Sequence, residues 1–341
     1  ARPDRSFRHL CGSWTRHWGS RMQGKLGAAL FGAALTLFLA WTLAAFSFQF
    51  ERFAMIAYMS ALAFAGMFCV LARRNLRHGW MGFILCLAAA TLWWSTITPQ
   101  QDLVWAPDTA RGVTAEFQGE TVIVHNIRDF IWKDRNTPTV RWKSETYSLN
   151  AITSVDLLTS VWSSPAIAHV LISFGFSDNR HLAFSAEIRR EADEEFSSIG
   201  GFFKTFELVL IAAEERDIVK LRTNFRGEDV SLFPLRLKPE QARLLLVTYL
   251  ERGNQLAAEP EFYNTITANC TTVIFRLARL VDPGLPFDWR VLASGYLPAY
   301  LFDLGAIDTT KPLDETLEDA RITSRAVLLS PSDNYSTGIR R

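Results

Sequence analysis

The chain has few cysteines and almost no excess charge. Only four of its 341 residues are cysteine, and the formal net charge is +1. A near-zero charge leaves no basic footprint for DNA or RNA, so we predict no nucleic-acid partner. The sequence also has no glycine-rich phosphate loop and no Gly-x-Ser-x-Gly elbow, and we predict no cofactor. These absences exclude the nucleotide-binding proteins and serine hydrolases that carry those two motifs.

Charged side chains are missing from three apolar stretches, at about residues 26–48, 53–72 and 79–97. Each has about the ~20 residues that a helix needs to cross a bilayer. The flanks with most Arg and Lys are the arm 1–25 and the connector 73–78, and such flanks stay in the cytoplasm. We therefore expect a cytoplasmic N-terminus, three transmembrane helices over 26–98, and an extracytoplasmic domain. The predicted location is the bacterial inner (plasma) membrane, whose lipid bilayer is the expected partner.

This topology separates the cysteines. Cys11 lies in the predicted cytoplasmic arm, and Cys69 and Cys86 lie in apolar spans, where cysteine acts as a small hydrophobe. Cys270 is then the one cysteine in the exported part, in the polar run 263–272. Oxidising compartments normally pair their cysteines, so an unpaired thiol there calls for a chemical explanation.

The exported part, 99–310, reads as an α+β domain with a mostly antiparallel sheet and helices. We predict strands at 121–127, 139–143, 166–176, 181–189, 206–212, 217–222 and 230–235 from short β-branched or aromatic runs. Helical spacing of apolar residues predicts helices from Pro239 to about residue 252, from Cys270 to about residue 281, and at 289–304. We expect the polar tail after Ala306, including 311–341, to pack poorly.

Cys270 is the strongest catalytic candidate. A thiol at a helix N-terminus lies near the positive end of the dipole and near free N–H groups, which lowers its pKa and prepares an anion site. The alternative is an inert buried cysteine. A nucleophilic thiol needs a base, and the exported histidines are His125, His169 and His181. His169 is the best choice, because its strand is apolar on both faces; it could also be a core histidine bonded to a backbone carbonyl.

The sequence leaves the third, orienting residue open. Glu187, Asn264 and Asn269 are candidates, and Arg189, Ser173 and His181 could support the site from a second layer or an oxyanion position. The charged runs 187–191 and 214–217 could help, or could form a solvated face. We predict no metal, because His169 and His181 lack the close ligand spacing of zinc motifs.

Four segments carry a resemblance to a known family: HVLISF at 169–174, FSAEIRRE at 184–191, EERDIVKLRTN at 214–224 and FYNTITANCTT at 262–272. They resemble the periplasmic domain of the bacterial Lnb-type lipoprotein intramolecular acyltransferases. The resemblance covers about residues 100–310. It implies a papain-like, thiol-hydrolase-like fold in which the histidine precedes the cysteine, with Cys270 and His169 as the catalytic pair.

The same resemblance implies an acyl transfer, from the glyceryl-linked lipid of a lipoprotein to the α-amino group of its N-terminal cysteine. Acylated lipoproteins, or another lipid acyl donor, are then the expected substrates. Two alternatives remain: a cell-wall amidase or cysteine peptidase with the same Cys-His dyad, and a non-catalytic membrane-anchored module in which Cys270 only packs.

Overall fold

The computed structural model describes residues 6–50, 53–330 and 334–340, with side chains from Lys25 onward. Two compact units meet at the boundary between Thr98 and Pro99. Cys11 and the basic side chains predicted to set the topology, apart from Lys25 and those of the connector 73–78, lie outside the described side chains. The two units are described separately.

The first unit consists of three helices, α1 (Ser6–Gln49), α2 (Ala54–Arg74) and α3 (Leu76–Thr96). Each contains a segment long and apolar enough to cross a membrane, and in α1 that segment is Lys25–Gln49. A small core of Phe31, Leu35, Phe68 and Phe83 joins them. Most of their other large apolar side chains are exposed, as expected for helices that face lipid. The prediction of three candidate N-terminal spans is confirmed.

The second unit is built on one eight-stranded sheet with the order β1-β2-β9-β8-β7-β6-β10, and β5 also pairs with β2. All neighbours are antiparallel except β2 and β9, so the predicted mostly antiparallel sheet is confirmed. The strands are β1 (Thr114–Gln118), β2 (Thr121–Arg128), β5 (Trp142–Ser148), β6 (Ile152–Val161), β7 (Ala168–Phe176), β8 (His181–Arg189), β9 (Glu207–Glu214) and β10 (Asp229–Pro234); β3 (Ile131–Trp132) and β4 (Pro138–Thr139) form a separate hairpin.

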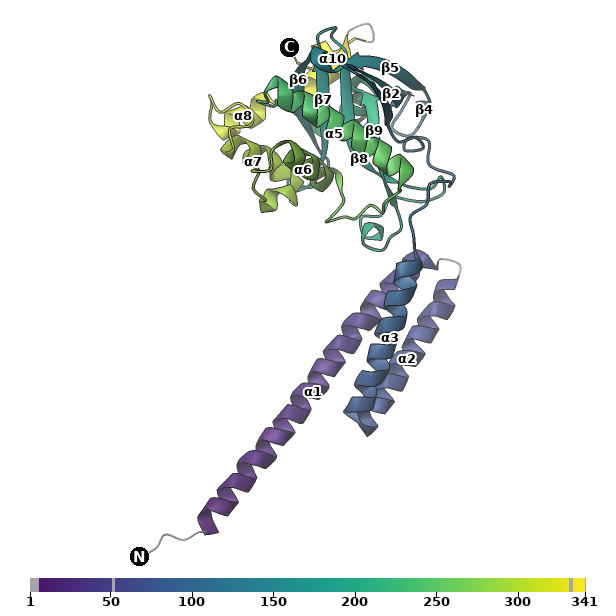
Figure 1. The fold of residues 1–341 in the computed structure, drawn as a ribbon, viewed down its shortest axis with the longest axis vertical. Helices are drawn as coiled ribbons and strands as arrows, with labels where there is room; N and C mark the ends of the chain where they lie inside the picture. The colour runs from purple at the N-terminus through teal and green to yellow at the C-terminus, as the bar shows by residue number, and fades with distance from the viewer. Residues whose placement is uncertain (1–5, 51–52, 331–333, 341) are drawn as a thin grey trace, which may run out of the picture. The chain divides into compact units, whose positions relative to one another are not determined.

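Helices cover both faces of this sheet (Figure 1). On one face α5 (Pro239–Ala258), α6 (Cys270–Val281) and α7 (Leu297–Asp303) share a large apolar core with alternate residues of the strands. The other face is covered by α4 (Glu215–Lys220), α9 (Thr323–Leu328) and α10 (Tyr335–Gly338), over a smaller core. A further short helix, α8 (Leu313–Asp319), follows α7. β7 therefore lies in the middle of a three-layer domain, buried on both faces as its sequence predicts.

Three sequence-based assignments are wrong. The predicted strand 139–143 spans the end of β4 and the start of β5, which are separate strands. The predicted strand 217–222 is helix α4 followed by η4, a π-helical turn at Leu221–Arg226. Asp217 is fully buried and its carboxylate binds Arg128 of β2, a distant partner that local β-propensity does not register. The predicted helix 289–304 is broken into η5 (Trp289–Val291), η6 (Ser294–Tyr296) and α7. Gly295 lies so close to the carbonyl oxygen of Pro165 that no side chain fits there.

The expectation that the segment after Ala306 packs poorly is also wrong. Ile322, Ala326, Tyr335 and Ile339 are buried in the second core. Arg340 reaches into the same layer, where its Nη2 donates to Asp156 at 2.7 Å and to Glu215 at 2.6 Å. Polar composition concealed this packing, because the apolar residues are few and widely spaced.

Replacing Arg340 should destabilise the domain. Asp156 is 2% exposed and Glu215 is fully buried, so Arg340→Met leaves two buried carboxylates without their cation. We expect the free energy of unfolding to fall by about 3 kcal/mol, measured by thermal unfolding of the full chain in micelles. The matched control is Arg236→Met, which breaks an exposed pair with Asp308 and should cost under about 1 kcal/mol. Equal effects of the two substitutions would contradict this account.

Candidate active site

Cys270 is the first residue of α6, as the sequence predicts. The side-chain oxygen of Asn269 accepts hydrogen bonds from the N–H groups of Thr271 at 3.0 Å and Thr272 at 2.8 Å, and the Thr272 hydroxyl accepts from the Asn269 N–H. This capping box stabilises the start of the helix and does not engage the N–H of Cys270. The thiol therefore lies at the positive end of a well-formed helix.

His169 lies near the start of β7, at a point where the sheet opens. Pairing between β7 and β8 stops at Leu171 and Ser185, two residues short of His169 and Glu187. Both strands continue to pair on their other sides, β7 with β6 as far as Ala168 and β8 with β9 as far as Arg189. The backbone of Val170, at this open end, helps to lower the pKa of the Cys270 thiol.

The two side chains shift each other's pKa. Burial raises the pKa of Cys270, but the charge and hydrogen bond of His169 outweigh it, with help from the Val170 N–H and the Thr271 hydroxyl, and the net pKa is lowered. Burial lowers the pKa of His169, yet Glu187 and Cys270 outweigh this effect and the opposing charge of Arg222, and raise it to about 9. Both shifts favour a thiolate beside an imidazolium at neutral pH.

Glu187 holds the other side of the imidazole ring. Its carboxylate lies 3.2 Å from His169 Nε2, and the Ser185 hydroxyl lies 2.6 Å from the same nitrogen while donating to Glu187 at 2.7 Å. His169 is 12% exposed and Glu187 22% exposed, so the pair is mostly shielded from water. With Nε2 held in this way, Nδ1 is the ring nitrogen that can face the sulfur. Cys270, His169 and Glu187 thus have the order of a catalytic triad.

Arg222 and Glu228 support Glu187 on the face of the sheet that α4 covers, opposite α6. The Arg222 guanidinium lies 3.3 Å from Glu187 and 3.5 Å from Glu228, and the Ser160 hydroxyl donates to Glu228. Arg222 comes from the π-helical turn η4, and such turns occur often at functional sites. Sequence reasoning did not find Arg222, Glu228 or Ser185. Strand alternation places Ser185 on the same face as Glu187. Arg222 lies in a turn that follows β9, and no local sequence pattern indicates that this turn contacts β8.

Glu187→Gln should slow turnover at the candidate site and shift the pH dependence of that turnover. Removing the negative charge lowers the pKa of His169 below about 9, so the imidazolium is lost at a lower pH. We expect ester turnover by the full chain to fall ten- to a hundredfold, and its high-pH limb to move toward neutral pH. A pH profile of turnover measures both, with Glu120→Gln, an exposed partner of Arg243, as the control. An unchanged high-pH limb would rule out Glu187 as the group that tunes His169.

The other candidate residues make different contacts. Asn264 closes a turn by accepting from the N–H groups of Ile266 and Thr267. Ser173 donates at 2.6 Å to Glu215, the carboxylate that Arg340 also binds. Arg189 donates to Gln101 and to the Ala110 carbonyl, and its guanidinium lies over Trp105. None of these contacts reaches His169 or Cys270, whereas Asn269 serves as the helix cap.

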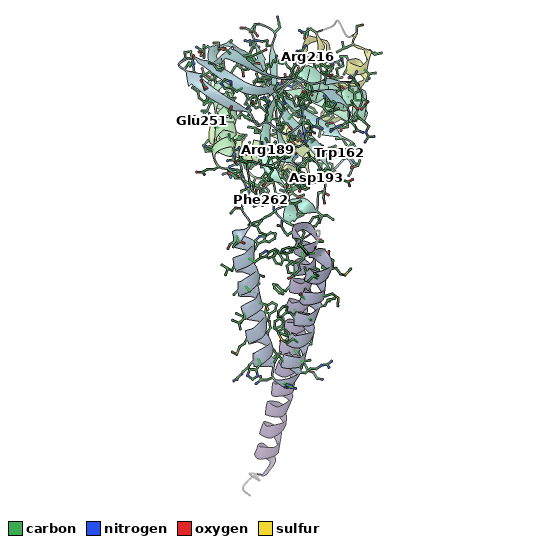
Figure 2. All side chains as sticks on the ribbon, turned by 90° about the vertical axis from the view of Figure 1, so that its right-hand side faces the viewer. Trp162, Arg189, Asp193, Arg216, Glu251 and Phe262 are labelled. Atoms are coloured by element: carbon green, nitrogen blue, oxygen red, sulfur yellow. The ribbon has the colours of Figure 1, made fainter. Side chains whose placement is uncertain are left out.

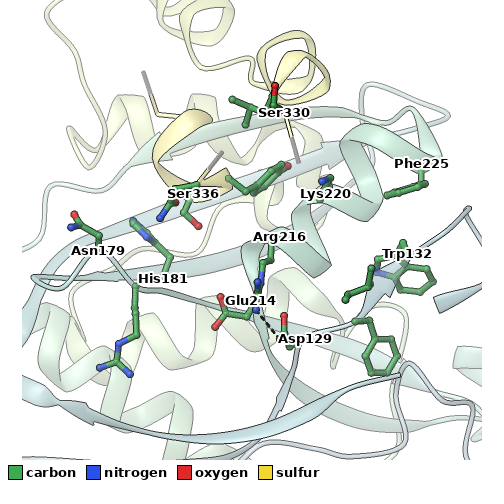
Figure 3. Close-up of a pocket in the computed structure, with 16 residues that line it drawn as sticks. Asp129, Trp132, Asn179, His181, Glu214, Arg216, Lys220, Phe225, Ser330 and Ser336 are labelled. Carbon is green, nitrogen blue, oxygen red and sulfur yellow. Dashed lines mark hydrogen bonds and ion pairs between the residues drawn. The ribbon is translucent and has the colours of Figure 1, made fainter. Parts of the chain in front are cut away.

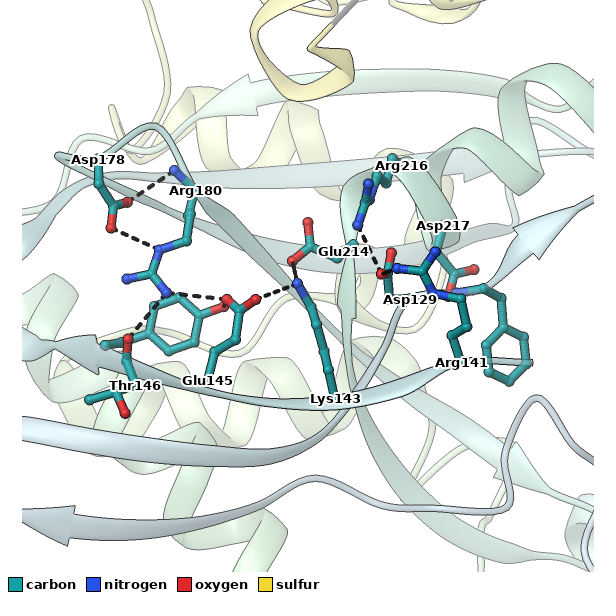
Figure 4. Close-up of polar contacts among 12 residues, drawn as sticks. Asp129, Arg141, Lys143, Glu145, Thr146, Asp178, Arg180, Glu214, Arg216 and Asp217 are labelled. Carbon is teal, nitrogen blue, oxygen red and sulfur yellow. Dashed lines mark hydrogen bonds and ion pairs between the residues drawn. The ribbon is translucent and has the colours of Figure 1, made fainter. Parts of the chain in front are cut away.

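His181 lies at the far end of β8, opposite Gly175 and six residues along β7 from His169, which is about 20 Å. It lines a separate polar pocket of about 350 Å³ together with Asp129, Glu214 and Arg216 (Figure 3). Ion pairs lie beside this pocket. Lys143 pairs with both Glu145 and Glu214, and Asp129 pairs with both Arg141 and Arg216 (Figure 4). The charged run 214–217 therefore includes buried structural pairs, and is not simply a solvated face.

An apolar cavity of about 390 Å³ lies among α5, α6 and α7. Thr271, the neighbour of Cys270, forms part of its wall, and Leu157, Ile172, Leu245, Ile274 and Leu297 supply much of the apolar lining. Its volume is within the range of small-molecule sites. An apolar group could thus be held close to the start of α6.

One comparison with known proteins found a match. Residues 138–295 match the family model described as the Lnb N-terminal periplasmic domain. The match includes β7, β8 and the start of α6, so the predicted Lnb-type domain is confirmed for this part of the chain. No curated protein and no solved structure matches the chain. An Lnb-like periplasmic domain that follows three candidate spans fits a membrane-anchored protein.

Proposed function

We propose that this chain is a membrane-anchored thiol acyltransferase or hydrolase that acts outside the cytoplasm. The observation that carries the proposal is the Cys270–His169–Glu187 arrangement, in which a thiol at a helix N-terminus has a lowered pKa beside an imidazole held by a carboxylate. A non-catalytic module has no need of this electrostatic arrangement. The inner membrane is the proposed location, with the N-terminus in the cytoplasm.

In the first half-reaction, the Cys270 thiolate attacks the carbonyl carbon of an acyl ester. A carbon–sulfur bond forms, and the carbonyl oxygen becomes an oxyanion that the free N–H of Cys270 can stabilise. The ester carbon–oxygen bond then breaks, and His169 gives its proton to the departing alkoxide. The products are an acyl thioester on Cys270 and an alcohol.

In the second half-reaction, an acceptor attacks the thioester. With an amine acceptor, His169 takes a proton from the nitrogen as the new amide bond forms, and the Cys270 thiolate leaves. The α-amino group of a lipoprotein's N-terminal cysteine is the acceptor we propose, from the Lnb-type resemblance. Water in its place gives hydrolysis. The apolar cavity beside Thr271 favours an acylated substrate over a peptide.

Mass spectrometry of lipoprotein N-termini tests the substrate. Membranes with the wild-type chain should contain N-acylated lipoproteins, and membranes with Cys270→Ala should keep a free α-amino group. Cys69→Ala, which changes an exposed cysteine of α2, is the matched control. Equal N-acylation in wild-type and Cys270→Ala membranes would contradict a lipoprotein substrate. Cleavage of cell-wall fragments by the wild type alone would favour an amidase.

A further inference from the structure

Large apolar side chains are exposed on two segments that flank the candidate active site. The first segment is the turn between β6 and β7, where Trp162 is 53% and Ile167 54% exposed. Ile167 lies two residues before His169. Trp289 and Leu292 of the η5 region, 60% and 48% exposed, lie beside this turn. The Gly295 N–H donates to the Ala166 carbonyl, and the Ser294 hydroxyl bonds the backbone of Ala168.

The second segment is the connection between β8 and β9, in which Phe196 is 67% and Ile199 60% exposed. It packs against the loop that leads to Cys270, because the Thr265 hydroxyl donates to the Ser198 carbonyl and Gly201 lies against Thr265 and Tyr263. Ile266 of that loop is also exposed. We call the residues of these two regions the apolar rim. Its first part is residues 162–167 and 289–296, and its second part is residues 196–202 and 263–267. Figure 2 shows Trp162 and Asp193 toward one end of the domain and Arg216 toward the other.

The chain enters the domain at this same end of the sheet. The Gln100 N–H donates to Glu207 at the start of β9, and the Ala192 N–H, just after β8, donates to the Val104 carbonyl. Only residues 97–99 stand between Thr96, where α3 ends, and Gln100. The first residue hydrogen-bonded to the sheet thus comes four positions after the end of a candidate membrane span.

We propose that the apolar rim inserts into the interfacial layer of the lipid bilayer, so that the site opens toward the membrane. Tryptophan, isoleucine and phenylalanine exposed together are what a membrane-interface surface requires, and a soluble monomer rarely exposes such a group. Asp193 and Glu195 are exposed in the same β8–β9 connection, so attraction to anionic lipid is not the driving force. The partner is an uncharged interface, such as a phosphatidylcholine surface.

Spin labelling of the full chain in phosphatidylcholine nanodiscs tests this proposal. The native cysteines, Cys270 included, are first replaced by alanine, so the result does not depend on catalysis. Single labels at Trp162, Ile199 and Trp289 report on the rim. A label at Ser177, exposed in the turn between β7 and β8 at the other end of these strands, is the control.

Collision rates with oxygen, which concentrates in lipid, and with a water-soluble nickel chelate separate the outcomes. If the rim inserts, its labels collide several-fold more with oxygen and several-fold less with the chelate than the Ser177 label does. Equal rates at all positions would show a rim in water and overturn the proposal. Low rates with both reagents would show a rim covered by protein and overturn it equally. Thiol chemistry at Cys270 could hold in either case, so the two proposals fail separately.

Discussion

Replacing His169 by glutamine should slow the alkylation of Cys270 at pH 6 by roughly ten- to a hundredfold. An ordinary cysteine with a pKa of ~8.5 is thiolate in only about one molecule in 300 at this pH. In the wild type the positive charge of His169 lowers the pKa of Cys270, so a much larger fraction is ionised. The gain in rate is smaller than the gain in thiolate, because a thiolate of lower pKa is less nucleophilic.

Iodoacetamide labelling of the native chain, with the modified peptides quantified by mass spectrometry, measures this rate at Cys270. His125→Gln is the matched control, because His125 bonds Ser144 and Glu116 at an edge of the sheet. That substitution should leave the rate unchanged. If His169→Gln labels as fast as the wild type at pH 6, His169 does not ionise the thiol, and the proposed pair is wrong.

Cys270→Ala should reduce turnover of an acyl ester by at least about 10³-fold, because no other described group beside His169 can form a thioester. Cys270→Ser should be almost as inactive, since a hydroxyl ionises far less readily than a thiol. A p-nitrophenyl acyl ester in micelles is a suitable probe for the full chain. Cys69→Ala should retain wild-type turnover. Residual turnover of Cys270→Ala within tenfold of the wild type would place the activity elsewhere.

Much of this site follows from local sequence rules. The apolar run around His169 predicts a central strand, and β7 is one. The polar, turn-rich residues before Cys270 predict a helix start, and α6 begins there. Alternation along 181–189 places Glu187 on a polar face of β8, the side where it meets His169. These features depend on residues close together in the chain.

The parts that sequence reasoning missed depend on distant partners. β6 was not predicted, because Asp156 and Ser160 interrupt its apolar pattern. Their partners, Arg340 and Glu228, are distant in the sequence. The helix at 215–220 depends on the burial of Asp217 beside Arg128. The opening between β7 and β8 at His169 is a property of three neighbouring strand pairs. No single segment carries that information.

Intact-protein mass spectrometry of the full chain after brief mixing with an acyl ester donor tests the central claim most directly. The account predicts a mass increase of one acyl chain on Cys270, removable by hydroxylamine as a thioester is, and absent from Cys270→Ala. A hydroxylamine-resistant adduct on another residue, or turnover by Cys270→Ala equal to that of the wild type, would contradict it.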